Sequence, residues 1–206
     1  MYLLPLSLCV LRHPLDTFRL ITRQREKFSI LPSLILLTLM VAVRLLSLQW
    51  THFPLQTIDP SNVNWVMETG LLLVPVLSIA ICTFAITSIM DGQVRMGEAI
   101  TSVTYAMMPY IVLTLPMTLL SQILGQGSTL YGLLEIGILV WCAVLYIISV
   151  KVMNDYTFAR TLLIILLVIL LMALMWAVVL LVMALWNQLK EFVSSVVREV
   201  RYLVLR

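Results

Sequence analysis

The sequence predicts an all-α integral membrane protein with five transmembrane helices, an N-terminal interfacial helix and a C-terminal amphipathic helix. Hydrophobic residues make up 62% of the 206 residues and charged residues only 11%, whereas a soluble domain has about 45–50% apolar and about 25% charged residues. The mean hydropathy is +1.07. The apolar runs are long and continuous, without the alternation of a barrel strand. A chain with so few polar residues needs lipid as its solvent, and its apolar runs are then helices.

The chain divides into three parts: a basic N-terminal segment (1–28), a transmembrane domain (29–186) and a C-terminal helix (187–206). Within the domain, apolar runs of membrane length predict five spans. These spans are 29–49, 68–90, 99–120, 130–150 and 161–186. The last span is the longest and the most uniformly apolar.

The N-terminal segment has the pattern of a helix with one apolar face. Leu11, Leu15 and Phe18 share that face, and Arg12 and Arg19 lie largely off it. The basic residues follow the first apolar stretch rather than precede it, so we do not expect a cleaved signal peptide. We expect a helix in the headgroup region with its arginines on anionic lipid. A frayed basic tail that only sets the topology is the alternative.

The C-terminal helix carries apolar residues at helical spacing and charged residues on its other faces. Its apolar stripe includes Phe192, Val196 and Val200. The helix is too polar on one side to cross lipid. Because Glu191 and Glu199 dilute its attraction to anionic lipid, we predict that the stripe contacts a protein partner.

Lysine and arginine in the short loops predict the orientation. The N-terminal segment carries four arginines and one lysine, and the loops after the second and fourth spans carry Arg95, Lys151 and Arg160. The links after the first and third spans carry neither residue type. We therefore expect a multi-pass plasma-membrane protein with a cytoplasmic N-terminus. Five spans then place the C-terminal helix outside the cell.

Two ionisable residues stand out within the spans. Arg44 lies about one to two turns from the outer end of the first span, and Glu135 about one turn from the outer end of the fourth. Their depths match, so a structural ion pair would spare each an unpaired charge in lipid. Glu68, at the outer end of the second span, is the competing partner for Arg44. Snorkelling to the interface and a proton or substrate relay are the other interpretations.

The third span contains two prolines, Pro109 and Pro116. Each removes a backbone hydrogen bond and bends a helix. The pair predicts a hinge or a cavity wall, with a static kink as the alternative. On the second span, Thr83 and Thr87 share one face, and we expect them to bond across helices or back to their own carbonyls.

Four short segments, in order along the chain, carry a resemblance. They are His13-Pro14-Leu15-Asp16-Thr17-Phe18, Met90-Asp91-Gly92, Tyr105-Ala106-Met107-Met108-Pro109 with Pro116 after it, and Asp155-Tyr156-Thr157-Phe158. Their order and spacing across about residues 13–190 resemble the Yip (Ypt-interacting protein) domain family, in its short bacterial members. The resemblance implies five spans, an inner N-terminus and an outer or lumenal C-terminus. It also marks Asp91, Gly92 and Tyr105 as an inner-loop motif.

The resemblance further implies a non-enzymatic role. Some bacterial members are encoded beside carbohydrate ABC importers, which suggests an accessory or scaffold protein that contacts permease subunits through its helices. A small transporter or channel that uses the kinked third span is the alternative. Eukaryotic members act in vesicle traffic and contact small GTPases through a long cytosolic N-terminal region that this sequence lacks. GTPase binding is therefore the second alternative. A homo-oligomer is compatible with the sequence.

Other function classes lack the residues that they need. The sequence shows no P-loop, HExxH, GxSxG or Cys/His cluster, so we expect no catalytic, cofactor or metal site and no enzyme activity. The three cysteines share no metal or redox spacing. A net charge of only +3 gives no support for nucleic-acid binding.

Overall fold

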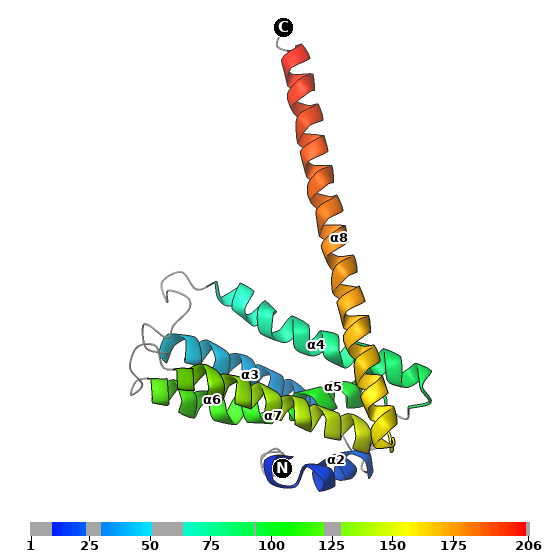
Figure 1. The fold of residues 1–206 in the computed structure, drawn as a ribbon. Helices are drawn as coiled ribbons and strands as arrows, with labels where there is room; N and C mark the ends of the chain where they lie inside the picture. Colours follow the sequence, from blue (N-terminus) through cyan, green and yellow to red (C-terminus); the bar gives the residue numbers. More distant parts are fainter. Residues whose placement is uncertain (1–9, 24–29, 51–63, 93, 122–128, 205–206) are drawn as a thin grey trace.

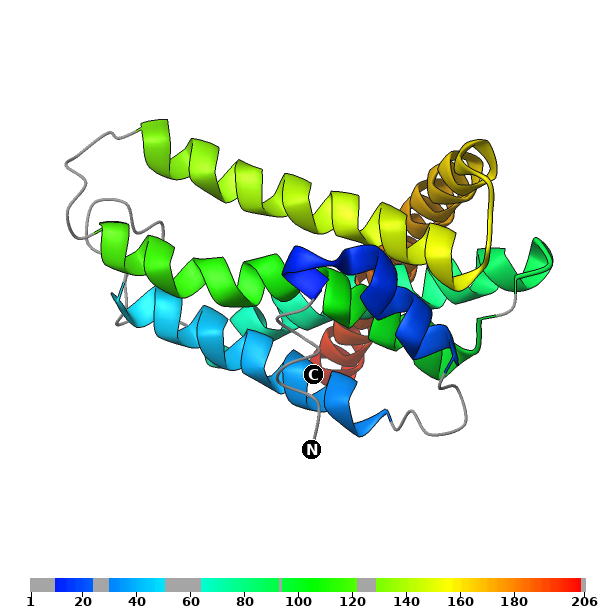
Figure 2. The same ribbon diagram turned by 90° about the horizontal axis from the view of Figure 1, so that it is seen from below.

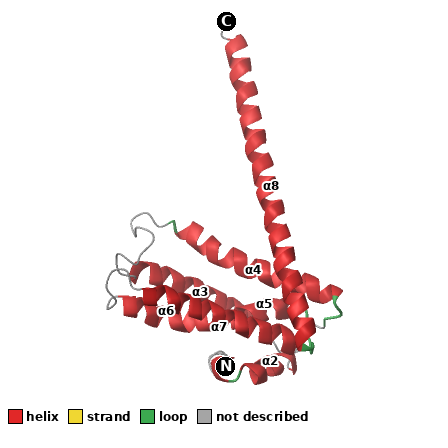
Figure 3. Cartoon of the chain, viewed as in Figure 1, coloured by secondary structure: helices red, strands yellow, loops and turns green. Residues whose placement is uncertain are grey.

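The computed structural model describes residues 10–23, 30–50, 64–92, 94–121 and 129–204. All regular secondary structure in these residues is helical (Figure 3). Five helices are long and apolar enough to cross a membrane: Leu31–Trp50, Trp65–Ile89, Met96–Ser121, Leu130–Met153 and Phe158–Val196. The predicted fold class, an all-α membrane protein with five spans, is confirmed.

The helices follow the predicted spans closely (Figure 1). They are α2 (Pro14–Arg23), α3 (Leu31–Trp50), α4 (Trp65–Ile89), α5 (Met96–Ala106), α6 (Met108–Ser121), α7 (Thr129–Met153) and α8 (Phe158–Val204). The start of α4 lies slightly before the predicted 68 because Asn64 caps it. The Asn64 side chain accepts hydrogen bonds from the backbone N–H groups of Val66 and Met67, which have no partner within the helix.

The bundle is organised around α5, which contacts α3, α4 and α7. Neighbouring hydroxyls on α5 join it to two of these helices. Ser33 of α3 and Thr101 lie 2.7 Å apart, and Ser102 donates to Ser149 of α7 at 2.7 Å. All four residues are buried. Without water to compete, such hydroxyl pairs hold helices together.

A third hydroxyl pair joins α4 to α7. The hydroxyls of Thr83 and Tyr146 lie 2.6 Å apart, and Thr83 also donates to its own Ile79 carbonyl at 2.6 Å. Thr87, one turn later, donates to the Thr83 carbonyl at 2.8 Å. These contacts confirm the prediction that the two threonines bond across helices or to their own backbone.

The N-terminal helix α2 packs against α7 (Figure 2). Its buried residues are Thr17, Phe18 and Ile21, whereas Leu15 is 48% exposed. Leu15 therefore lies off the face of α2 that packs on the bundle. The helix is rotated so that the face with Phe18 and Ile21 meets the bundle, and Arg19 remains exposed. Within the described part of the N-terminal segment, residues Pro14–Arg23 form a helix that packs on the bundle.

The last helix, α8, differs from the others in length and direction. It contains 47 residues, about 70 Å at 1.5 Å per residue. Only its first turns are buried in the bundle, through Thr161, Ile164 and Val168. It crosses α4 at a steep angle and then extends away from the other helices (Figure 1). Every residue from Ala177 to Val196 is exposed.

The sequence changes from uniformly apolar to amphipathic after residue 186, but the helix does not end there. α8 continues through Asn187 to Val204 as one element. Neither glycine nor proline occurs in that part of the chain, and the helix passes without interruption through Asn187, a residue type that can follow a helix end. The amphipathic segment is thus the continuation of the fifth span and not a separate helix.

Candidate functional site: two facing turns

The first turn links α4 to α5 through Met90, Asp91 and Gly92. Asp91 has a left-handed backbone, with φ of 54°, which aspartate tolerates better than most residues. The N–H of Gly92 donates to the carbonyl of Thr87 at 2.7 Å. That bond satisfies one of the carbonyls that remain free at the end of a helix.

The second turn links α7 to α8 and uses the same device. Asp155 is also left-handed, with φ of 51°. The N–H of Tyr156 donates to the carbonyl of Lys151 at 3.1 Å, and the Asn154 side chain donates to Val150 at 3.1 Å. Each chain reversal is therefore made by an aspartate in the left-handed region.

The two turns contact each other through one backbone carbonyl. The hydroxyl of Tyr156 donates to the Met90 carbonyl at 3.1 Å, and the guanidinium of Arg160 donates to the same oxygen. Arg160 also lies over the ring of Tyr156, 4.7 Å from its centroid. Its Nη2 is 3.9 Å from Oδ2 of Asp91. We call Met90–Gly92 and Asn154–Arg160 the facing turns.

Gly92 lies where the two turns approach most closely. A Cβ atom there would lie 2.6 Å from the Thr87 carbonyl oxygen and 2.7 Å from both Asn154 Oδ1 and the Tyr156 hydroxyl. These distances are too short for a carbon atom, so only glycine fits without a shift of the backbone. The Asn154 Oδ1 atom is buried and accepts no hydrogen bond from the described residues.

The electrostatics of the facing turns favour a neutral Tyr156. Burial raises the pKa of Tyr156; the positive charge of Arg160 opposes this rise, and the negative charge of Asp91 adds to it. The Asp91 side chain is 97% exposed, so its ion pair with Arg160 contributes little. The bonds to the Met90 carbonyl are the stronger contacts, and they attach the start of α8 to the end of α4.

Arg44 has a different partner from the one predicted. Its Nη2 is 3.5 Å from Oε2 of Glu68, with the side chains 34% and 9% exposed respectively. The expected pairing with Glu135 is not formed, and the Glu135 side chain is exposed. The physical reason is the packing order, because α6 contacts both α3 and α7 and so lies between the helices of Arg44 and Glu135 (Figure 2). Glu68 gains from its place in the first turn of α4, where the helix dipole favours a carboxylate.

Comparison with known families identifies the chain. The Yip1 domain profile matches residues 8–187. The chain belongs to the Yip1 domain family. No curated protein and no solved structure gives a significant match. The matched region contains both facing turns and ends at Asn187, within the exposed part of α8.

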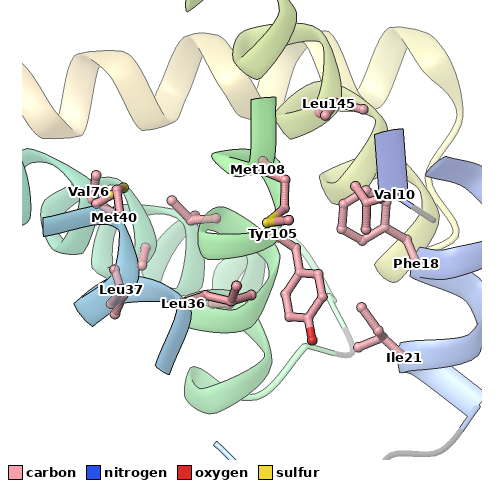
Figure 4. Packing of buried hydrophobic residues seen from close by; sticks show 14 of the residues in the cluster. Val10, Phe18, Ile21, Leu36, Leu37, Met40, Val76, Tyr105, Met108 and Leu145 are labelled. Atoms are coloured by element: carbon pink, nitrogen blue, oxygen red, sulfur yellow. The ribbon is translucent and has the colours of Figure 1, made fainter. Parts of the chain in front are cut away.

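Within the Yip1 domain, Tyr105 belongs to the core rather than to the exposed turn. Its ring is fully buried and lies between Leu36 of α3 and the α2 residues Phe18 and Ile21 (Figure 4). Its hydroxyl has no hydrogen-bond partner among the described residues. Of the three motif residues, Asp91 and Gly92 therefore form the turn, and Tyr105 packs α5 against α2 and α3.

The third span of the Yip1 domain bends before its first proline. The helix is interrupted at Met107, whose N–H bonds to the carbonyls of Val103 and Thr104, both at 3.2 Å. Pro109 has no N–H to offer the carbonyl four residues earlier, so the regular pattern fails there. Pro109 is buried. Pro116 is exposed and leaves α6 unbroken.

The predicted partner-binding residues lie beyond the bundle. Phe192 and Val196 are exposed on α8, and the side chain of Val200 lies outside the described part. The sequence interpretation did not single out Arg160 and Asn154, which help to form the facing turns. The local sequence contains no signal for them, because Tyr156 precedes α8 while Arg160 lies within it, and their contacts depend on how the two turns meet.

The described residues contain no group of three or more His, Cys, Asp or Glu side chains that could hold a metal ion. What the facing turns offer is a guanidinium, an exposed carboxylate and a backbone carbonyl that accepts two hydrogen bonds. These groups fix the relative positions of two helix ends.

Proposed function

We propose that the protein is a non-enzymatic accessory or scaffold protein of the plasma membrane that acts through helix contacts with another membrane protein. The observation that supports this proposal is α8, which the facing turns attach at its base and which leaves the bundle over most of its length. Membership of the Yip1 domain family is consistent with this role.

The exposed apolar surface of α8 must be buried against lipid or another protein. Large apolar side chains are exposed along it, from Leu174 to Val196. Lipid covers those that lie within the bilayer, whose hydrocarbon core is about 30 Å thick. The helix is far longer than this, and Phe192 and Val193 follow polar residues at 187 and 188. Burying each such side chain stabilises a complex by about 1.5–3 kcal/mol.

The partner to test first is the permease pair of a carbohydrate ABC importer, which the bacterial family resemblance suggests. A tagged full-length chain is purified from native membranes in a mild detergent, and the proteins that co-purify at stoichiometric amounts are identified. Recovery of permease subunits supports the proposal. Solute flux through liposomes that contain this protein alone, with no partner recovered, contradicts it.

Variants of the α8 stripe sharpen this test. Val196→Asp and Val200→Asp place a charge on the apolar face, and the same positions changed to leucine keep it apolar. Ser194→Asp puts the same charge on a neighbouring face. If the partner binds the stripe in a fitted groove, neither the aspartate nor the leucine variants should co-purify with it, whereas Ser194→Asp should. If every variant still co-purifies with the partner, this helix is not part of the interface.

A small transporter or channel is the second candidate, because the bend at Met107 and the Arg44–Glu68 pair lie in neighbouring helices. Flux assays with the purified chain decide between the two functions. Most of the hydroxyls in the spans already bond to carbonyls or to one another. Packing between helices therefore accounts for them better than a polar path does.

The orientation is part of the proposal. A cytoplasmic N-terminus places the facing turns inside the cell and the link 51–63 outside. Single cysteines in that link should react with an impermeant thiol reagent in intact cells, and a cysteine at Asp91, which is exposed, should react only after the cells are opened. Reversed labelling would contradict the orientation.

A further inference from the structure

We propose that the end of α8 pairs with the same segment of a second copy of this chain, as a parallel two-stranded coiled coil over 186–203. The inference departs from the proposed function at one point, because it assigns this exposed surface to a second copy of the chain and not to a different membrane protein. It concerns residues that lie almost entirely after the Yip1 domain match, which ends at 187.

The sequence of this segment repeats every seven residues. With Trp186 at position a, all a and d positions are apolar: Trp186, Leu189, Val193, Val196, Val200 and Leu203. The outer positions b, c and f hold polar residues or tyrosine: Asn187, Gln188, Glu191, Ser194, Ser195, Arg198, Arg201 and Tyr202. An apolar seam with a polar outer surface is the pattern of a coiled coil.

The seam residues also predict the number and direction of the strands. The β-branched Val193 and Val200 occupy a positions, and Leu189 and Leu203 occupy d positions, whereas Trp186 at a and Val196 at d fall outside this pattern. The four residues that follow the pattern favour two parallel strands. Two copies in one membrane share one topology, so their α8 helices leave the bilayer on the same side and point the same way. Confinement to one membrane raises their effective concentration, which helps a short seam to form.

The structure disfavours lipid as the covering of this seam. α8 runs through Asn187 without a break (Figure 1), and a helix that crosses the bilayer cannot lie flat on its surface unless it bends. The described seam residues, from Trp186 to Val196, are all exposed and so are not covered by the chain's own bundle. The charges on the other faces are mixed, with Glu191 beside Lys190, so attraction to anionic lipid is weak.

Cysteine cross-linking of the full-length chain in native membranes tests the proposal. Val193→Cys and Val196→Cys place a thiol in the seam, and Ser194→Cys places one on the outer face between them. The native chain, with its own three cysteines, gives the background. Under mild oxidation the two seam variants should form covalent dimers of this chain several-fold above background, because equivalent seam residues face each other in a parallel pair. Ser194→Cys should stay at background.

Three results overturn the proposal, and they are distinguishable from a failure of the proposed function. Equal dimer yields from all three variants indicate random collision. Cross-linking of Val196→Cys to a different protein excludes the second copy but supports the accessory function. Background yields from both seam variants exclude the coiled coil, and the accessory function is then decided separately by co-purification.

Discussion

Arg160, at the start of α8, donates a hydrogen bond to the backbone carbonyl of Met90, at the end of α4. Tyr156 donates to the same carbonyl from the turn before α8. These two bonds, together with the buried residues Thr161, Ile164 and Val168, attach the base of α8 to the bundle, while the helix from Ala177 to Val196 is exposed. The facing turns therefore help to fix the direction in which α8 leaves.

Gly92→Ala should destabilise the protein. The added Cβ would lie within 2.7 Å of three oxygen atoms, one of them the backbone carbonyl of Thr87, so the facing turns would have to separate. Overpacking of this kind typically costs about 1–3 kcal/mol. The measurement is the thermal midpoint of the purified protein in detergent.

Gly137→Ala is the matched control for this substitution. Gly137 lies within α7, and a Cβ atom there has no neighbour within 4 Å. Alanine in a helix is favoured over glycine by about 0.5–1 kcal/mol, so the midpoint should stay the same or rise. Equal effects of the two substitutions would show that Gly92 is not confined.

Tyr156→Phe should change the dependence of stability on pH. At neutral pH the variant loses the hydrogen bond to Met90, worth about 0.5–1.5 kcal/mol. Because burial raises the pKa of Tyr156 above its ordinary value of 10.0, folding favours the neutral phenol. That contribution is fully present below pH 10.0 and is lost as the pH rises through the higher folded value. Phenylalanine does not ionise and has no such loss.

The stability gap between native protein and Tyr156→Phe should therefore be constant from neutral pH to about pH 9 and narrow above pH 10. Thermal midpoints of both proteins across this range measure the gap. Other tyrosines are common to both proteins, so their ionisation cancels in the difference. A gap that stays constant into the alkaline range would show that Tyr156 is not desolvated by folding.

The spans could be predicted because they depend on local properties of the sequence. Hydrophobicity over membrane length is sufficient to find a helix in lipid. The predicted start of α4 was less accurate because the true start depends on a single N-cap residue, Asn64. The continuity of α8 was missed because the change from apolar to amphipathic sequence after Trp186 suggested a boundary. Asn187 can mark the end of a helix, but Asn and Gln are also tolerated in a helix interior, and α8 continues through both residues.

Contacts between distant segments could not be predicted in the same way. Hydropathy gives the depth of Arg44 in its helix but not which helices are its neighbours, so Glu135 and Glu68 were both candidates. The facing turns were each visible as a short motif, but their mutual contact depends on how α4 and α8 pack. The rotation of α2 likewise follows from its fit against α7 and Tyr105.

The Arg44–Glu68 pair predicts a measurable coupling. Arg44→Ala leaves the buried carboxylate of Glu68 without its cationic partner. Glu68→Gln removes that carboxylate charge, so the cation is no longer needed. The two changes together should therefore cost less than the sum of the single losses. Since Arg44 is one-third exposed, we expect a coupling near the lower end of the usual range, about 0.5–1 kcal/mol. Thermal midpoints of the four proteins in the cycle give this value.

A second cycle, with Glu135→Gln in place of Glu68→Gln, is the control. Glu135 is exposed on α7, so its change and Arg44→Ala should add to within about 0.5 kcal/mol. A larger coupling to Glu135 than to Glu68 would restore the pairing that the depths of the two residues first suggested.

The two prolines of the third span should respond in opposite directions to alanine. Pro116 is exposed within the unbroken helix α6, and alanine there restores a backbone N–H in a helix interior, where proline is disfavoured by up to about 3 kcal/mol. Pro116→Ala should therefore raise the thermal midpoint.

Pro109 is buried beside the interruption at Met107, and its neighbours pack around the bend. Pro109→Ala removes part of a buried ring and favours a straight helix that the packing does not accommodate. It should therefore lower the midpoint, by about 1–3 kcal/mol in unfolding free energy. If Pro109→Ala instead stabilises the protein as Pro116→Ala does, the packing does not hold the bend. The static kink would then be excluded, and a hinge that moves between two helix directions would be the better account of this span.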